Sequence, residues 1–132
     1  MIPQLVHQLA VDVTYPKIVR YLIPAIEHGR CSEWTPDSIY QELIAGRQLL
    51  FVDDYHDPKN ALVARFATWG GERVLYLAFM GGEGNADWRQ AMKHMKQFAS
   101  RYGVSRVTGH FRDGWSKHFK MKKLITLYEI EE

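Results

Sequence analysis

A glycine-rich stretch, GGEGNA at residues 81–86, is the first candidate for chemistry in this sequence. It follows an apolar run typical of a strand and precedes an amphipathic run typical of a helix. A glycine-rich turn at such a junction leaves backbone N–H groups free to bind an anion such as phosphate. The simpler alternative is that Gly81, Gly82 and Gly84 only allow a sharp turn. For an isolated turn of this kind we favour that alternative.

Acid–base chemistry has two candidates. His110 stands near the end of a predicted strand, and the intrinsic pKa of a histidine suits a general base at neutral pH. Glu72 lies in a predicted hairpin turn and is the second candidate for a base. The alternative for His110 is a hydrogen-bonded structural histidine, which we favour because the sequence does not identify its partners.

A basic segment runs from residue 112 to residue 123. Its cations alternate with Trp115 and Phe119, a pattern that can bind a nucleic-acid backbone and stack bases. The cations are Arg112, Lys117, Lys120, Lys122 and Lys123. The same pattern also suits a solvated face above two core aromatics, and we favour this alternative because such charge runs usually serve solubility. We therefore expect no nucleic-acid partner.

The acidic stretch DDYHDP contains Asp53, Asp54, His56 and Asp57, but its spacing matches no calcium loop and suits a hairpin turn. The single cysteine, Cys31, cannot build a disulfide framework or, alone, a zinc site. We expect no metal. The sequence has no phosphate-binding P-loop, nucleophile elbow, zinc-protease spacing or dinucleotide fingerprint.

Composition indicates a single globular domain spanning residues 1–132, with 46% hydrophobic and 24% charged residues. The net charge of +2 is too small to predict nucleic-acid binding by itself. No apolar run approaches the ~20 residues of a membrane span, and the N-terminal residues lack the features of a signal peptide. We expect a cytoplasmic protein without a membrane partner.

Two helices are predicted in the first third of the chain. The first should begin at Pro16, which suits a first helical position, and Pro24 should kink or shorten it. The second has Thr35 as its cap, followed by a proline and an aspartate, and Gly46 can end it.

The remaining periodicity predicts an α/β (α+β) fold with a mixed, mostly antiparallel sheet. The runs QLLFVD, ALVARFATW and RVLYLAFM should form a three-stranded meander. A helix is predicted over Ala86 to Tyr102, then strands at RVTGHF and LITLYEI separated by a short helix or turn at DGWSKHF. A short strand near QLVHQL is a further possibility. Residues Tyr76–Met80 and Arg106–Phe111 should be parallel neighbours.

This order of elements, with the segments FMGGEGNADWRQAMKHMKQFASRYG and GHFRDGWSKHFK, resembles the GNAT superfamily of N-acetyltransferases. Within it, the segments are most similar to small GNAT-like proteins of tailed bacteriophages. The resemblance implies acetyl-CoA as cofactor, with its pyrophosphate held by the loop and helix N-terminus after the fourth strand. The loop amides would be those of Gly82, Gly84, Asn85 and Ala86. The pantetheine arm would pair with the backbone of Ala78, Phe79 and Met80, and Lys120 with its neighbouring lysines would hold the 3′-phosphate.

Two positions depart from the pattern of that family. The loop lacks the usual leading arginine or glutamine, and Glu83 places a negative charge where phosphates would lie. Phe119 stands where many members have the tyrosine that protonates the leaving thiolate, and phenylalanine donates no proton. The resemblance leaves His110 and Tyr128 as the candidate catalytic substitutes.

The resemblance implies a GNAT-type transfer of an acetyl group from acetyl-CoA to an amine of a small molecule or a protein. The alternative is a non-catalytic phage GNAT-like structural or interaction protein with a degenerate cofactor pocket. Such a protein would bind a phage or host protein in the virion, during assembly or in the host cytoplasm. The missing signature residue, Glu83 and Phe119 favour this alternative.

Overall fold

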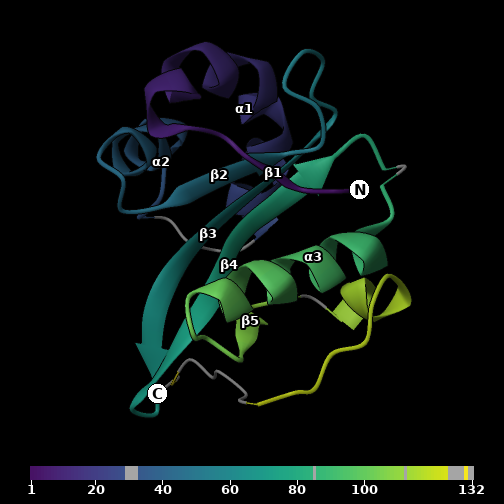
Figure 1. The fold of residues 1–132 in the computed structure, drawn as a ribbon. Helices are drawn as coiled ribbons and strands as arrows, with labels where there is room; N and C mark the ends of the chain where they lie inside the picture. Colours follow the sequence, from purple (N-terminus) through teal and green to yellow (C-terminus); the bar gives the residue numbers. More distant parts are fainter. Residues whose placement is uncertain (29–32, 85, 112, 125–129, 131–132) are drawn as a thin grey trace.

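The computed structural model describes residues 1–28, 33–84, 86–111, 113–124 and 130. Within these residues a five-stranded sheet has the spatial order β1-β2-β3-β4-β5 (Figure 1). The strands are β1 (Gln4–Leu5), β2 (Leu49–Val52), β3 (Asn60–Trp69), β4 (Glu72–Gly82) and β5 (Val107–Gly109). The first four pair antiparallel, and β5 is parallel to β4. The predicted meander and the short N-terminal strand are confirmed.

Helices cover both faces of the sheet (Figure 1). Helices α1 (Val11–His28) and α2 (Pro36–Ile44) lie on one face, and α3 (Trp88–Arg101) lies on the other. Alternate residues of β2, β3 and β4 contribute to the two cores. Val63 and Phe79 belong to the α1/α2 side, whereas Leu62 and Met80 belong to the α3 side. The fold class is α+β, as predicted.

Helix α2 begins and ends where its sequence predicts. The Thr35 side chain accepts a hydrogen bond from the backbone N–H of Ser38, and the Ser38 hydroxyl accepts from the backbone N–H of Thr35. This capping box satisfies two N–H groups that have no partner within the helix. Gly46 follows the helix with φ +76°, a conformation that glycine adopts at little cost.

The predicted start of α1 at Pro16 is wrong, because the helix begins five residues earlier at Val11. The His7 ring accepts a hydrogen bond from Leu9 N–H and caps a 3-10 turn over Gln8–Ala10 that leads directly into α1. Pro24 does not shorten the helix either. It removes a single backbone donor, while the helix stays anchored by the fully buried Ile18 and Leu22.

Helix α3 is shorter than the predicted range from Ala86 to Tyr102. The Asp87 side chain accepts from Gln90 N–H, so the helix begins at Trp88. Tyr102 is the C-cap, and 54% of its surface is exposed. The predicted short helix is present as a 3-10 segment, η2 (Asp113–Lys117), whereas the predicted closing strand LITLYEI lies mostly outside the described residues. No helix of the described chain has the length and apolar character of a membrane span.

Candidate functional site

Strands β4 and β5, which are parallel, separate at a bulge in β4. Val63 of β3 lies opposite Phe79 and Ala64 lies opposite Leu77, so Ala78 is an extra residue on β4. Strand β5 pairs with β4 only from Leu75 to Leu77 among the described residues. The predicted parallel pairing of Tyr76–Met80 with Arg106–Phe111 is therefore correct in direction, but the pairing among the described residues is shorter and ends where the bulge begins.

Beyond the bulge, the edge of β4 on the β5 side has no strand partner among the described residues, and we call this unpaired edge the opening. Residues Ala78, Phe79 and Met80 are the predicted pantetheine-binding positions, and all three lie on this stretch. Phe79 and Met80 bury their side chains on opposite faces of the sheet. The side chains thus anchor the strand, and its backbone is the part that a ligand lying along this edge would meet.

His110 lies at the point where the strands part. Its Nδ1 is 2.7 Å from the Tyr76 hydroxyl oxygen, and the two rings meet edge to face with centroids 5.6 Å apart. The register explains this contact, because Tyr76 lies opposite Thr108 and His110 is two residues further along the same face. If Nδ1–H donates to Tyr76, the lone pair of Nε2 is available to accept a proton. Within the described chain Nε2 has no hydrogen-bond partner.

Tyr76 is a site residue that the sequence analysis missed. The alternating pattern of RVLYLAFM predicts that Tyr76 lies on the opposite face from Leu75 and Leu77, as the structure shows. On the same face the Arg65 guanidinium carbon lies 4.6 Å from the centroid of the Tyr76 ring. Trp34 and Phe79 add an apolar wall, with ring centroids 6.2 Å apart.

Two of the loop glycines are explained by close packing. Gly81 and Gly82 belong to β4 rather than to a free loop, and the predicted role of the Gly82 amide stays a prediction. A Cβ on Gly81 would lie 2.0 Å from the Tyr21 carbonyl oxygen, and one on Gly82 would lie 1.7 Å from Asn60 Oδ1. Gly84 differs, because it is exposed with φ +91° and no atom within 4 Å of an added Cβ.

The other predicted loop donors are less informative. Ala86 is half-buried against the α3-side core, and Asn85 lies outside the described residues.

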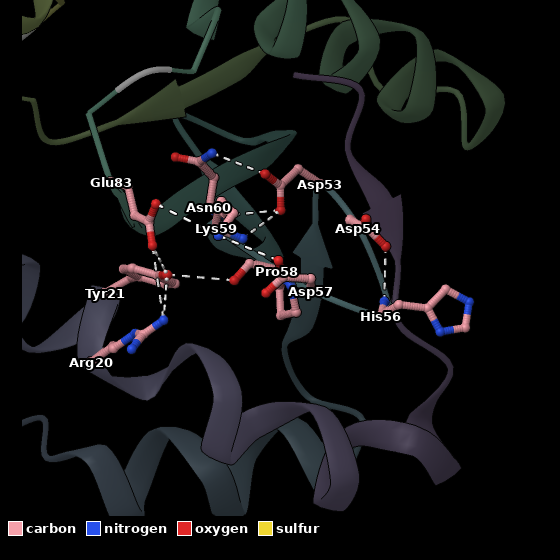
Figure 2. Close-up of polar contacts among 10 residues, drawn as sticks. All are labelled: Arg20, Tyr21, Asp53, Asp54, His56, Asp57, Pro58, Lys59, Asn60 and Glu83. Carbon is pink, nitrogen blue, oxygen red and sulfur yellow. Dashed lines mark hydrogen bonds and ion pairs between the residues drawn. The ribbon is translucent and has the colours of Figure 1, made fainter.

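Glu83 is turned toward α1 (Figure 2). Its Oε1 accepts a hydrogen bond from the Tyr21 hydroxyl at 2.9 Å, and Arg20 and Lys59 lie within 3.9 Å of its carboxylate oxygens. The pKa of Lys59 is raised by a hydrogen bond to Asp57 and by the charges of Asp57 and Glu83. The carboxylate expected to repel phosphates therefore lies beside two cations.

The N-terminus of α3 already contains an anion of the chain itself. Asp87 Oδ1 accepts from Gln90 N–H at 3.1 Å. Such a cap satisfies one of the N–H groups that a bound phosphate would use, and its charge repels a phosphate. This is the feature of the site that fits a pyrophosphate least well.

The aromatic residues of the basic segment belong to the core. Phe119 is buried, with its ring 5.4 Å from Phe111, and Trp115 packs 5.6 Å from Trp88 at the start of α3. The lysines remain exposed, as the favoured alternative predicts, and Lys120 directly follows Phe119. Tyr128 lies outside the described residues, so its predicted catalytic role stays a prediction.

The acidic stretch after β2 has a structural role (Figure 2). The Asp53 carboxylate accepts hydrogen bonds from the backbone N–H groups of Lys59 and Asn60 and from the Asn60 side chain. Burial alone would raise the pKa of Asp53, but these hydrogen bonds together hold it below its ordinary value. The carboxylate thus closes the turn between β2 and β3.

The fold matches that of several acetyltransferases. A probable acetyltransferase is 14% identical, with 100% of this chain and 99% of that chain covered and a TM-score of 0.66. An aminoglycoside acetyltransferase from an uncultured soil metagenomic sample, in complex with sisomicin, is 11% identical and has a TM-score of 0.67. The match covers 98% of this chain and 95% of that chain. A predicted acetyltransferase from Clostridium acetobutylicum with acetyl-CoA is 9% identical and has a TM-score of 0.66. The match covers 98% of this chain and 94% of that chain.

These likenesses confirm the predicted GNAT-like fold, and at such low identities they show the fold alone. No family model matches the sequence, and no curated protein matches it either.

Proposed function

We propose that this protein transfers an acetyl group from acetyl-CoA to an amine. The observation that carries the proposal is the parting of β4 and β5 at the Ala78 bulge, directly beside the paired His110 and Tyr76. The opening presents a strand edge to an extended, amide-rich arm and places a potential base at its mouth. A fold shared with acetyltransferases supports this choice among the possible uses of such an opening.

In this proposal the chain acts mainly by positioning. Bound acetyl-CoA supplies the acetyl group as an activated thioester. The backbone of Ala78, Phe79 and Met80 holds the arm and directs an N–H at the place where negative charge develops. Gly84 and Ala86 supply amides at the phosphate end, and Lys120 supplies a cation.

His110 is the proposed catalytic base in this scheme. With Nδ1 bonded to Tyr76, its Nε2 accepts the proton that the attacking amine releases. Tyr76 acts through His110 and is a positioning residue.

Thermal unfolding with and without millimolar acetyl-CoA tests the proposal first. A ligand at one hundred times its dissociation constant adds about 2.7 kcal/mol to the free energy of unfolding, so we expect a clear rise in Tm with acetyl-CoA and none with ATP. We then expect CoA release when amines are supplied, and a loss of about 10²-fold or more in kcat for His110→Gln.

His118→Gln is the matched control for the base. His118 is exposed, its ring packs beside Trp115 and makes no contact with Tyr76 among the described contacts, and its substitution should leave CoA release unchanged. The proposal is wrong if neither a Tm shift nor CoA release is observed across a broad panel of amines.

A second candidate function is a non-catalytic protein that binds another protein, such as a phage or host partner. The Asp87 cap favours it, because a carboxylate at the α3 N-terminus opposes pyrophosphate binding. This candidate predicts no response to acetyl-CoA and a stoichiometric complex with one partner after purification from the native source. A selective Tm shift with acetyl-CoA contradicts it.

A further inference from the structure

An inference that rests on the proposed acetyl transfer concerns the amine that accepts the acetyl group. We propose that the acceptor also carries an anionic group, a carboxylate or a phosphate, and that Arg65 binds this group beside the Tyr76–His110 pair. Arg65 would then be a specificity-determining residue.

Of the seven arginines that the structure describes, four have no carboxylate partner, and among these four Arg65 alone is half-buried, whereas Arg73, Arg89 and Arg101 are exposed. Arg20, Arg47 and Arg106 each lie beside a glutamate. Among the described residues no ion pair is found for Arg65, although its side chain is half-buried. A partly desolvated guanidinium has five donors in a planar fork that matches a carboxylate or a phosphate, so an anionic ligand would supply the partner that the fold leaves out.

The position of Arg65 is set by the sheet and not by a mobile loop. Arg65 and Tyr76 are directly opposite each other on β3 and β4, and the guanidinium lies over the Tyr76 ring. Arg65 is also only one residue past Ala64, the last β3 residue paired with β2. Stacking on an aromatic ring restricts the guanidinium while leaving its edge N–H groups available for bidentate binding.

Tyr76 connects this cation to the proposed base. Its ring lies beneath Arg65, and its hydroxyl contacts His110 Nδ1 at 2.7 Å. The cation and the base are therefore separated by about the length of one phenol side chain. A compact molecule with an amine at one end and an acidic group a few bonds away can reach both.

Gln48 lies across from Arg65 on the neighbouring strand side and carries no negative charge that would neutralise the guanidinium. It directly precedes β2, where Leu49 lies opposite Ala64, so one step along the register it faces Arg65. Its side chain is 3% exposed, and its Oε1 has no hydrogen-bond partner. A neutral amide leaves the charge of Arg65 uncompensated, which favours an acidic acceptor over a polycationic one.

The proposed transfer needs only the acceptor amine, the thioester, His110 and a proton from solvent. The amine nitrogen attacks the thioester carbonyl carbon, the new C–N bond forms, and the C–S bond breaks. His110 takes the proton that the nitrogen loses, and the thiolate of CoA leaves and takes up a proton from solvent. Arg65 binds the distant anion of the acceptor and takes no part in bond changes.

Matched acceptor pairs test the inference through CoA release. One pair compares an amino acid with its carboxamide, and a second compares an amino-sugar phosphate with the amino sugar. We expect kcat/KM to be about 10-fold to 100-fold higher for the acidic member, the range expected of hydrogen bonds to a charged group. The two pairs separate a carboxylate from a phosphate as the preferred anion.

Variants then assign the preference to Arg65. Arg65→Gln should reduce the ratio between acidic and neutral acceptors to near one, chiefly through KM, and Arg65→Lys should restore part of it. Arg73→Gln is the matched control, because Arg73 is exposed and stacks on Phe66 at 4.5 Å instead of on the Tyr76 ring. It should leave the ratio unchanged.

Three outcomes overturn the inference. Equal kcat/KM within both acceptor pairs, or a preference that survives in Arg65→Gln, overturns it while acetyl transfer itself still stands. Absence of both CoA release and an acetyl-CoA thermal shift overturns the proposed function, and this inference with it.

Discussion

Gly81→Ala is the sharpest test of why the loop after β4 is rich in glycine. The added Cβ would lie 2.0 Å from the Tyr21 carbonyl oxygen and 3.0 Å from its carbonyl carbon. Carbon and oxygen atoms normally approach to about 3.3 Å, so α1 and β4 must separate by on the order of 1 Å. Both are fixed by buried residues, Ile18 and Leu22 on α1 and Phe79 on β4, so the separation opens gaps in the core.

We expect Gly81→Ala to lower the free energy of unfolding by about 2–4 kcal/mol, the cost of overpacking against backbone atoms. For a domain of this size the corresponding fall in Tm is roughly 8–15 °C. Urea unfolding with an unchanged m-value would show that the loss is one of stability and not of two-state behaviour.

Two other glycines are matched controls for this substitution. Gly84 has φ +91° and open space around an added Cβ, so Gly84→Ala should cost about 1 kcal/mol from backbone conformation alone. Gly114 has open space and no positive φ, and Gly114→Ala should change stability by less than about 0.5 kcal/mol. If the free energy of unfolding of Gly81→Ala lies within about 0.5 kcal/mol of that of the unsubstituted protein, close packing does not explain why this residue is a glycine.

Two pH-dependent effects follow from single side chains. Burial, with a smaller contribution from Asp37, raises the pKa of Tyr15 to about 12 from 10.0. The neutral phenol therefore stabilises the fold fully below pH 10.0, and this stabilisation is lost as the pH rises to about 12. Tyr15→Phe should remove up to about 2–3 kcal/mol of alkaline destabilisation, measured as the difference between two urea-unfolding pH series; parallel series would contradict this. Asp53 has the opposite sign, because its lowered pKa means that the carboxylate stabilises above 3.8 and loses this effect as the pH falls through its folded pKa. Asp53→Asn should flatten the acid limb of stability between about pH 5 and pH 2, and an unchanged acid limb would show that Asp53 does not contribute.

Local signals predicted most of the architecture. The Thr35 cap, the Gly46 stop and the change from helical to alternating periodicity each act over a few residues, so the sequence predicts α2 and the meander correctly. The start of α1 was missed because the 3-10 turn capped by His7 supplies the first helical turns upstream of Pro16. That capping interaction left no strong pattern in the sequence.

Long-range register was harder to predict than the elements themselves. The parallel pairing of β4 with β5 was expected, but the Ala78 bulge that ends it is decided by packing on both faces of β4. For the same reason the sequence found His110 without its partner. Tyr76 is 34 residues away, and only the register brings the two side chains to 2.7 Å.

The two ends of the opening beside β4 differ in how well they suit acetyl-CoA. At the acyl end, a bulged strand edge lies next to a histidine whose ring is held by Tyr76. At the phosphate end, Gly81 and Gly82 serve packing, and Asp87 takes an N–H of α3 that a phosphate would need. Glu83 does not add to this conflict, because Tyr21, Arg20 and Lys59 hold its charge on the α1 side. In the proposed complex, binding energy would therefore come chiefly from the arm and acyl group of acetyl-CoA, and the exposed lysines around Lys120 are the proposed source of positive charge for its phosphates.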